Sequence, residues 1–315
     1  MKNKKNIYLL LIVITTCMIS RAQTNVADSG VHRLIAFATT INPEQQVQQS
    51  KELAKLFTKE NSNQWRSKGD QLRSYYFQAA GSNMPYRLYV PATWDGKTTL
   101  PLVVFLHGAW NDESSYVTAN DKQMIRLAEQ YGFILVSPLG YSKLGGYGNS
   151  LLLPALFGKP AEVTKIMASV TSERTHTLEL SEMDVINVIE LVLNEYPVNA
   201  SAMYLTGHSM GSGGTLYIGA KYNNYWKALA PMSGPFVDEK LYPWNRISTI
   251  PVFISEGNKS TASLESSRLL ATWMKEHNYK VEYSEVEGDH AGMVPVVLPK
   301  VFDFFNRCYQ KINSK

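Results

Sequence analysis

The chain has 315 residues, 44% of them hydrophobic, with 31 basic and 27 acidic residues. This length suffices for one large globular domain with a modest appendage. The basic excess lies within the first 22 residues, and the remainder carries 27 residues of each sign. Because this remainder is near neutrality and has no Lys/Arg block, its charge gives no reason to expect a nucleic-acid partner.

The first 22 residues are typical of an export signal. Three lysines precede an apolar run over residues 7–18, and Ser20 and Ala22 frame a small-x-small cleavage pattern. We therefore expect cleavage after Ala22 and an exported protein, periplasmic or secreted. The run is shorter than the roughly 20 residues that span a bilayer, so no permanent membrane anchor is expected. A lipoprotein modified at Cys17 is the alternative to this cleaved soluble form.

Residues 23–72 are predicted to form an N-terminal helical extension. Apolar residues recur at helical spacing within residues 43–61, at Val47, Leu53, Leu56 and Phe57. This piece is expected either to pack on the core or to be a loosely attached leader. The catalytic domain is expected over residues 73–315.

From residue 73 onward, extended and helical patterns alternate. Segments 73–80 and 85–91 are expected to pair as antiparallel strands around a turn at residues 81–83. The other predicted strands are 100–108, 133–138, 202–209, 226–234, 250–257 and 280–288. The predicted helices are 121–132, 181–197 with Ser181 as its N-cap, a segment from Met210, 263–278 and 294–309. This order predicts an α/β fold with a mainly parallel sheet and a site at the carboxyl ends of its strands.

Residues 139–177 interrupt the alternation. They are rich in Gly, Pro and Leu and exceed a normal connection, which predicts a lid or binding insertion. Aromatic residues are expected around the same mouth, at Trp110, Tyr141, Tyr147 and Trp244. Such rings either pack a lid on the core or stack on a sugar or phenolic acyl group. Trp110, Tyr141 and Trp244 are the candidate substrate-binding residues.

The motif GHSMG at residues 207–211 lies between an apolar extended run and a helix-compatible stretch. Its glycines allow the tight turn that would expose Ser209 Oγ as a nucleophile. A serine hydroxyl needs a base to take its proton, and that base is usually an imidazole. His290, in EGDHAG between the last predicted strand and the last helix, is the best candidate.

The negative charge that develops on an attacked carbonyl oxygen needs preorganised N–H donors. The segment FLHGAW, residues 105–110, follows a predicted buried strand. The expected donors are the backbone amides of Ala109 and Met210. Taken alone, the segment is better explained as an ordinary strand end, but its order with GHSMG and GDH favours the oxyanion role.

The motifs LVVFLHGAWND, YLTGHSMGSGGT, PMSGP and EGDH together resemble the α/β-hydrolase superfamily over residues 73–309. Within it the chain is similar to the branch of feruloyl esterases, acetylxylan esterases and polyhydroxybutyrate depolymerases. The resemblance implies an α/β-hydrolase fold with helices on both faces of the sheet. It also implies a serine carboxylic ester hydrolase without a cofactor, acting through an acyl-enzyme on small-molecule or oligosaccharide esters, including acylated plant polysaccharide fragments.

Two other functions stay open. The first is a peptidase of the prolyl-oligopeptidase type, although only about 50 residues precede the first strand after the signal, too few for a propeller. The second is a non-catalytic binding protein on a hydrolase scaffold. It is motivated by a departure from the family pattern at the triad acid.

Relatives usually place the acid three residues after the glycine that ends the strand 250–257, and here that residue is Ser260. A serine cannot stabilise the imidazolium that forms during proton transfer. Glu256, at the mouth of the same strand, is the first choice for the acid, and Asp238 is the second. Asp289 adjoins the base but would need an awkward local turn. For each of them, a surface carboxylate is an equally good interpretation.

The remaining histidines give no metal-binding signal. The six histidines form no HExxH pattern and no short-spaced pairing with carboxylates, so no metal is expected. His208, inside the motif GHSMG, is expected to support the turn rather than act as the base.

Overall fold

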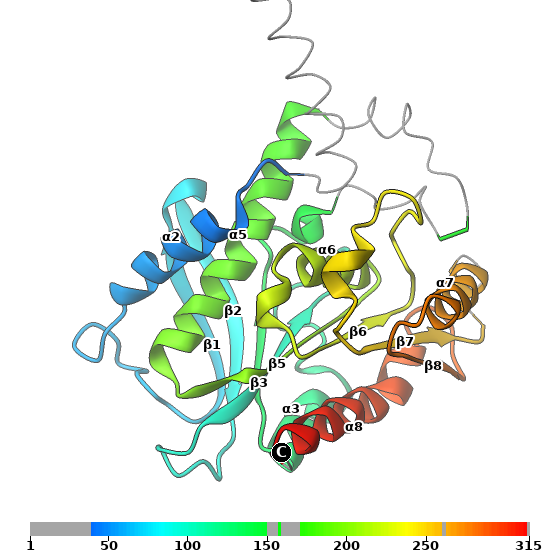
Figure 1. Cartoon of the computed structure of the whole chain (residues 1–315). Helices are drawn as coiled ribbons and strands as arrows, with labels where there is room; N and C mark the ends of the chain where they lie inside the picture. Colours follow the sequence, from blue (N-terminus) through cyan, green and yellow to red (C-terminus); the bar gives the residue numbers. More distant parts are fainter. Residues whose placement is uncertain (1–38, 150–156, 159–170, 260–262, 314–315) are drawn as a thin grey trace, which may run out of the picture.

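The computed structural model describes residues 39–149, 157–158, 171–259 and 263–313 (Figure 1). The predicted export signal over residues 1–22 lies outside this part of the chain. So do residues 150–156 and 159–170 of the predicted insertion, and so does Ser260.

Eight strands form one sheet in the order β1-β2-β4-β3-β5-β6-β7-β8. The strands are β1 (Gly69–Phe77), β2 (Ser82–Val90), β3 (Leu100–Leu106), β4 (Ile134–Pro138), β5 (Val198–His208), β6 (Ala228–Met232), β7 (Val252–Gly257) and β8 (Val281–Val286). Strand β2 is antiparallel to β1 and β4, and the pairs from β4 to β8 are parallel. The predicted α/β fold with a mainly parallel sheet is therefore confirmed.

The strands differ in burial according to their place in the sheet. In the central strand β3 every residue after Leu100 is buried, as expected where helices cover both faces. In the edge strand β1 the burial alternates, with Tyr75 and Phe77 buried and Leu72 and Tyr76 more than half exposed. This period of two leaves the outer face of β1 open to solvent.

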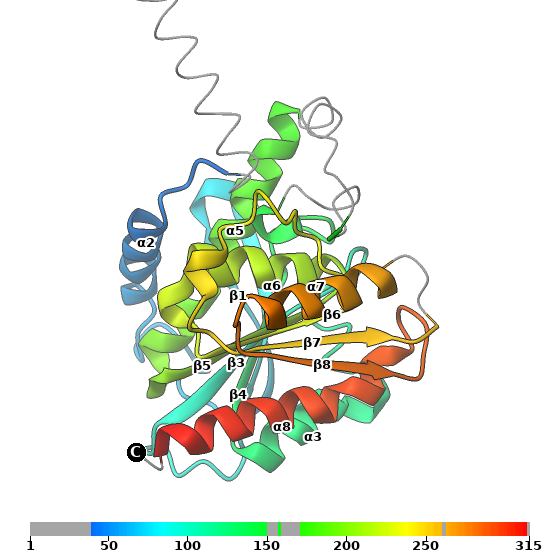
Figure 2. The same cartoon turned by 45° about the vertical axis from the view of Figure 1, so that its right-hand side comes forward.

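The helices cover both faces of the sheet, α5, α6 and α7 on one and α3 and α8 on the other (Figures 1 and 2). They are α2 (Pro43–Lys55), α3 (Ala119–Tyr131), α5 (Ser172–Glu195), α6 (Met210–Lys221), α7 (Leu264–Glu276) and α8 (Met293–Asn313). Each face has its own apolar core, and the two cores are separated by the sheet. Among the described residues, no helix combines the length and the apolar character needed to cross a membrane.

Helix α5 begins nine residues before its predicted start. The hydroxyl of Thr171 accepts from the amide of Arg174 at 3.1 Å and caps the helix. Ser181 is therefore not the N-cap; it is buried mid-helix, where its hydroxyl accepts from Tyr147 N at 2.9 Å. The polar first turns, TSERTHT, show no apolar periodicity, which is why the sequence pattern misplaced the start.

The N-terminal extension is packed on the core. Helix α2 begins at Pro43, and the Asn42 side chain caps it by accepting from Gln45 N at 2.9 Å. It lies against α5 (Figure 1), where Ser50 Oγ donates to Asn187 Oδ1 at 2.6 Å. Of the two arrangements left open by the sequence, the structure has the packed one over the part of the extension that it describes.

Thr39, just before α2, reaches a buried ion pair. Lys221 Nζ and Glu182 Oε1 lie 2.7 Å apart, and both side chains are almost fully buried. The Thr39 hydroxyl donates to Glu182 Oε2 at 2.5 Å and accepts from Lys221 Nζ at 2.7 Å. The extension thus supplies a hydrogen-bonding group to the interior of the domain.

Candidate active site

Ser209 occupies a strained turn between β5 and α6. Its backbone angles, φ 57° and ψ −116°, lie outside the usual regions for a residue with a side chain. Its amide donates to Met232 O at 3.0 Å, which ties the turn to the end of β6. Among the residues flanking it, Ser209 alone is not buried. The turn therefore leaves the Ser209 side chain partly exposed among buried neighbours.

The glycines of this turn are required by space. We call residues 207–211 the elbow. A Cβ on Gly207 would overlap Gly211 O, and a Cβ on Gly211 would overlap Leu106 O at the end of β3. Only glycine at both positions lets the first turn of α6 pack this closely against β3.

His290 is the partner of Ser209. Its Nε2 lies 2.9 Å from Ser209 Oγ, and it comes from the loop between β8 and α8, as predicted. Gly288, at φ 143°, turns this loop, and its carbonyl accepts from Lys259 N at 2.9 Å. The loop also passes so close to Gly257 that a Cβ there would lie 2.6 Å from Gly288 O. This loop therefore holds His290, the predicted base, against the end of β7.

His208 supports His290 from inside the elbow. It is 2% exposed; Tyr116 Oη lies 2.7 Å from its Nδ1, and the His290 carbonyl lies 2.6 Å from its Nε2. Burial, aided by repulsion from His290, lowers the pKa of His208 to about 3. Burial raises the pKa of Tyr116 to about 12, so its hydroxyl stays protonated and donates to Nδ1. A neutral His208 then donates through Nε2 to the His290 backbone.

The predicted oxyanion donors lie beside this pair. Ala109 follows β3, and Met210 follows Ser209 at the start of α6. The contact of Gly211 with Leu106 O and His107 O brings these two chain segments together. In the described part of the chain, neither the Ala109 nor the Met210 amide donates to a protein acceptor. Both N–H groups remain the predicted donors to a substrate oxygen.

The side of the site opposite the nucleophile contains a buried serine and a buried glutamate. His290 Nδ1 lies 2.7 Å from Ser233 Oγ, and Ser233 Oγ lies 2.9 Å from Glu256 Oε1. Glu256 is fully buried and also accepts from Ser267 Oγ at 2.7 Å and from Gly257 N at 3.3 Å. We call Ser233, Glu256 and Ser267 the acid side. The first-choice carboxylate therefore reaches the base only through a hydroxyl.

The other two candidate carboxylates cap local turns. Asp238 Oδ1 accepts from Lys240 N at 2.9 Å and from Leu241 N at 3.2 Å. Asp289 Oδ1 accepts from Gly292 N at 2.7 Å, at the start of α8. Both carboxylates have the hydrogen bonds of turn-capping residues.

Ser233 was not predicted from the sequence. It follows β6 directly, inside the motif PMSGP, and Glu256 is the next-to-last residue of β7. Met232 and Ser255 are register partners in the parallel pair β6–β7, so the residues that follow them lie side by side. This register is the signal that could have identified Ser233.

Two of the three candidate aromatic residues lie in loops at the carboxyl ends of strands. Trp110 follows Ala109, has a positive φ of 70° and is 75% exposed. Its amide donates to Lys143 O at 2.9 Å, in the loop that follows β4 and also holds Tyr141. Trp110 is thus an exposed ring next to a predicted oxyanion donor. Tyr147, by contrast, is fully buried and donates to His107 O at 3.1 Å.

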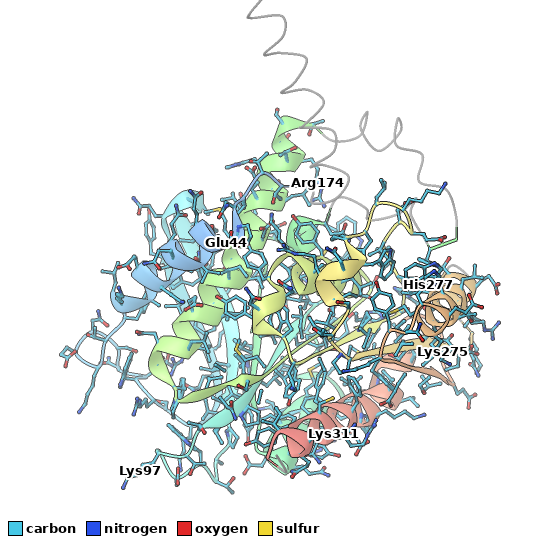
Figure 3. The ribbon with its side chains drawn as sticks, in the orientation of Figure 1. Glu44, Lys97, Arg174, Lys275, His277 and Lys311 are labelled. Carbon is cyan, nitrogen blue, oxygen red and sulfur yellow. The ribbon has the colours of Figure 1, made fainter. Side chains whose placement is uncertain are left out.

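Trp244 lies elsewhere, in the short helical turn η4 (Trp244–Ile247) that precedes β7. Its ring centroid is 4.4 Å from that of Trp273, which in turn stacks on His277 at 4.0 Å, at the end of α7 (Figure 3). The same aromatic cluster includes Phe157 of the predicted insertion, whose ring centroid lies 6.1 Å from that of Trp244. Trp244 therefore packs beside α7 against a residue of that insertion.

No cluster of three or more His, Cys, Asp or Glu side chains suited to a metal ion occurs among the described residues.

A sequence profile of the Esterase family matches residues 78–280, well over half of the chain. The chain belongs to the Esterase family. This membership indicates hydrolysis of carboxylic esters, and the matched range includes the elbow, Ala109, Ser233 and Glu256. His290 lies ten residues beyond it. No curated protein sequence matches this esterase.

Solved structures of esterases share the fold. A thermostable esterase superposes with a TM-score of 0.55 at 21% identity, covering 76% of this chain and 62% of its own. The S-formylglutathione hydrolase FrmB from Staphylococcus aureus gives 0.56 at 14% identity, covering 76% and 96%. A ferulic acid esterase from Anaeromyces mucronatus, in complex with ferulic acid, gives 0.54 at 18%, covering 78% and 94%. At these identities the likeness establishes the fold of this esterase.

Proposed function

We propose that the protein hydrolyses carboxylic esters by a serine mechanism, with Ser209 as the nucleophile and His290 as the base. The observation that carries this proposal is the 2.9 Å contact between Ser209 Oγ and His290 Nε2 at a strained strand-to-helix turn. Such a turn costs on the order of 1–3 kcal/mol, and it persists at functional sites where it presents a reactive group.

In the proposed cycle Ser209 Oγ attacks the acyl carbon while His290 Nε2 takes the hydroxyl proton. The amides of Ala109 and Met210 donate to the oxygen that becomes negative. The bond to the alcohol then breaks as His290 returns the proton to the leaving oxygen, which leaves an acyl-serine. Water, activated by the same imidazole, hydrolyses this ester and regenerates Ser209.

Labelling with a fluorophosphonate probe tests the nucleophile. The expected result is one probe per chain on Ser209, shown by peptide mass spectrometry, and no labelling of Ser209→Ala. Hydrolysis of p-nitrophenyl acetate should fall in this variant to the level of buffer. The matched control is Ser137→Ala, at a buried serine of β4 whose hydroxyl has no hydrogen-bond partner among the described residues. Hydrolysis retained by Ser209→Ala would disprove the proposal.

For the substrate, we propose esters of a phenolic acid or of a sugar, as found in acylated plant polysaccharide fragments. Trp110 supports this proposal because an exposed ring next in sequence to a predicted oxyanion donor offers a stacking surface for a flat group. The ferulic acid esterase with the same fold holds ferulic acid in its structure. Trp110→Ala should raise KM for methyl ferulate more than KM for triacetin. Tyr76→Ala, at an exposed aromatic residue on β1, is the control.

We also propose that the protein acts outside the cytoplasm, as a periplasmic or secreted enzyme. The support is the sequence of residues 1–22, which has a basic start, an apolar run and a cleavage pattern. Mass spectrometry of the protein from its native host should find an N-terminus at Gln23. An intact Met1 would contradict export, whereas a lipid on Cys17 would replace the cleaved soluble form with the lipoprotein.

A further inference from the structure

We propose that Ser233 is a positioning residue that links the base to the charge of Glu256, in place of the acid that relatives supply directly. The inference rests on the proposed function, because it assigns a partner to the base of that mechanism. It concerns a contact chain of three steps: Ser209 to His290 at 2.9 Å, His290 to Ser233 at 2.7 Å, and Ser233 to Glu256 at 2.9 Å.

The hydrogen bonds around Glu256 fix the direction of this chain. The amide of Gly257 can only donate, and it points to Glu256 Oε1 at 3.3 Å, so this oxygen acts as an acceptor. The Ser233 hydroxyl has a single proton, which it donates to the same oxygen. Its own oxygen is then left to accept from His290 Nδ1.

This direction selects the productive form of the imidazole. With its proton on Nδ1, His290 presents an unprotonated Nε2 to the Ser209 hydroxyl. A directly bonded aspartate fixes the same tautomer in the familiar triad. Ser233 therefore performs the orienting part of that role without carrying a charge.

The charge is supplied by Glu256. Its side chain is fully buried and accepts three hydrogen bonds, and no Lys or Arg of the described residues pairs with it. A buried carboxylate without a cation is costly. During catalysis the imidazolium of His290 forms two hydrogen bonds away and provides the opposite charge, and burial strengthens the attraction.

The backbone holds Ser233 in this position. Its φ is 60°, in the left-handed region, and its amide donates to Ser255 O at 2.9 Å across to β7. The next carbonyl, that of Gly234, accepts from Ser212 Oγ at 2.6 Å. A conformation that is unfavourable for serine is thus fixed from both neighbouring elements, as is common where a side chain must point in one direction.

The test compares variants that separate orientation from charge. Ser233→Ala removes the link, whereas Glu256→Gln keeps the shape and the acceptor but removes the charge. Ser233→Asp in a Glu256→Gln background places a carboxylate directly on Nδ1, and aspartate tolerates a positive φ. Ser255→Ala is the matched control, because Ser255 is a buried serine next to Glu256 whose hydroxyl has no partner in the described structure. Ser209→Ala is measured in parallel.

The readout is kcat/KM for p-nitrophenyl acetate between pH 5 and pH 9, with a thermal melt for every variant. Ser233→Ala and Glu256→Gln should each lower the maximal kcat/KM by roughly 10- to 100-fold, a fraction of the ~10⁴-fold that loss of a triad aspartate costs. Both should move the acidic limb of the profile to lower pH, since less negative charge then stabilises the imidazolium. Relative to Glu256→Gln, the Ser233→Asp double variant should move the acidic limb of the profile to higher pH and regain activity. Ser255→Ala should match the wild type.

Three outcomes would overturn the inference. Folded Ser233→Ala with wild-type kcat/KM would do so, as would a loss of activity without any movement of the acidic limb in Ser233→Ala or Glu256→Gln. If Ser233→Ala does not fold, an unchanged pH profile of kcat/KM in Glu256→Gln would overturn the inference. If Ser209→Ala is inactive in the same experiment, these results reject the link through Ser233 and leave the proposed function standing. Activity in Ser209→Ala would instead reject the proposed function.

Discussion

Around Ser209 the site is built by the backbone, whereas around Glu256 it is built by side chains. In the elbow, two glycines pack against carbonyl groups with no room for a Cβ, and the strained φ of Ser209 follows from that packing. On the acid side, Ser233, Glu256 and Ser267 are joined by hydroxyl hydrogen bonds between neighbouring elements. A steric constraint admits one residue type, but a hydrogen-bonded chain can be rebuilt with others. The acid side is accordingly the part of the site that the sequence motifs left open.

The largest effect is expected from Gly211→Ala in the elbow. Its Cβ would overlap Leu106 O, so α6 must shift away from β3 and carry Met210 and Ser209 with it. We expect a loss of at least ~100-fold in kcat/KM, in line with a 1 Å misplacement, and a destabilisation of about 1–3 kcal/mol from overpacking. Urea unfolding and ester hydrolysis measure the two.

The control for this variant is Gly219→Ala, also within α6. Its Cβ would meet only the movable Leu229 side chain, so activity should be retained. Equal losses in both variants would show that the elbow has no special demand for glycine, and the contrast between the two regions would disappear.

The second-largest effect is expected from His208, which makes the free energy of unfolding depend on pH. The pKa of His208 falls from 6.5 to about 3 on folding, so the unfolded chain binds more protons between these values. Its contribution to stability is complete above pH 6.5 and is lost as the pH falls toward 3. Between pH 7 and pH 4.5 this loss should be about 2 kcal/mol in the wild type.

His208→Gln should remove that part of the pH dependence of the free energy of unfolding, at the cost of lower stability at pH 7. His176→Gln, at an exposed position on α5, should leave the dependence unchanged. Urea unfolding at the two pH values provides the comparison. If His208→Gln loses as much stability between pH 7 and pH 4.5 as the wild type, His208 is not held neutral.

A smaller effect is expected from Ser267→Ala on the acid side. The variant removes the donor to Glu256 Oε2 but leaves the chain to His290 intact. Loss of one hydrogen bond to a buried charge costs about 1.5–3 kcal/mol of stability, whereas kcat/KM should fall only a few-fold. Calorimetry and ester hydrolysis measure these changes, and a loss of activity larger than that of Ser233→Ala would contradict the order of the chain.

The smallest effect is expected from Asp238→Asn. An asparagine oxygen can accept from Lys240 N and Leu241 N as the carboxylate does, so the turn should persist. Because this turn keeps its hydrogen bonds, activity and its pH profile should match the wild type within about twofold. A displaced acidic limb in this variant would make Asp238 part of the acid side.

The same contrast explains what the sequence could predict. The elbow, its flanking strand and helix, and the position of His290 follow from local signals, because glycine spacing and strand-to-helix order leave few alternatives. Glu256 was selected as the acid from its place at a strand end, but its contact with Ser233 depends on the register of β6 and β7. Register is a long-range property, and no local pattern around Ser233 encodes it.

The start of α5 shows a different limit. Its N-cap was predicted at Ser181, where the apolar periodicity begins, but the polar first turns from Thr171 onward carry no such periodicity. The ring contact of Trp244 with Trp273, by contrast, depends on the course of the chain in space. For Ser260, the residue that stands in the usual acid position, the contacts lie outside the described residues.

The position of Thr39 has a practical consequence for handling the protein. Its hydroxyl serves both Glu182 and Lys221 in the interior, and burial lowers the pKa of that lysine. A protease cut between Thr39 and α2 would take an acceptor away from a buried ammonium group and open a route for water to it. We therefore expect a chain trimmed to the first strand of the sheet to be less stable than one that begins at residue 39.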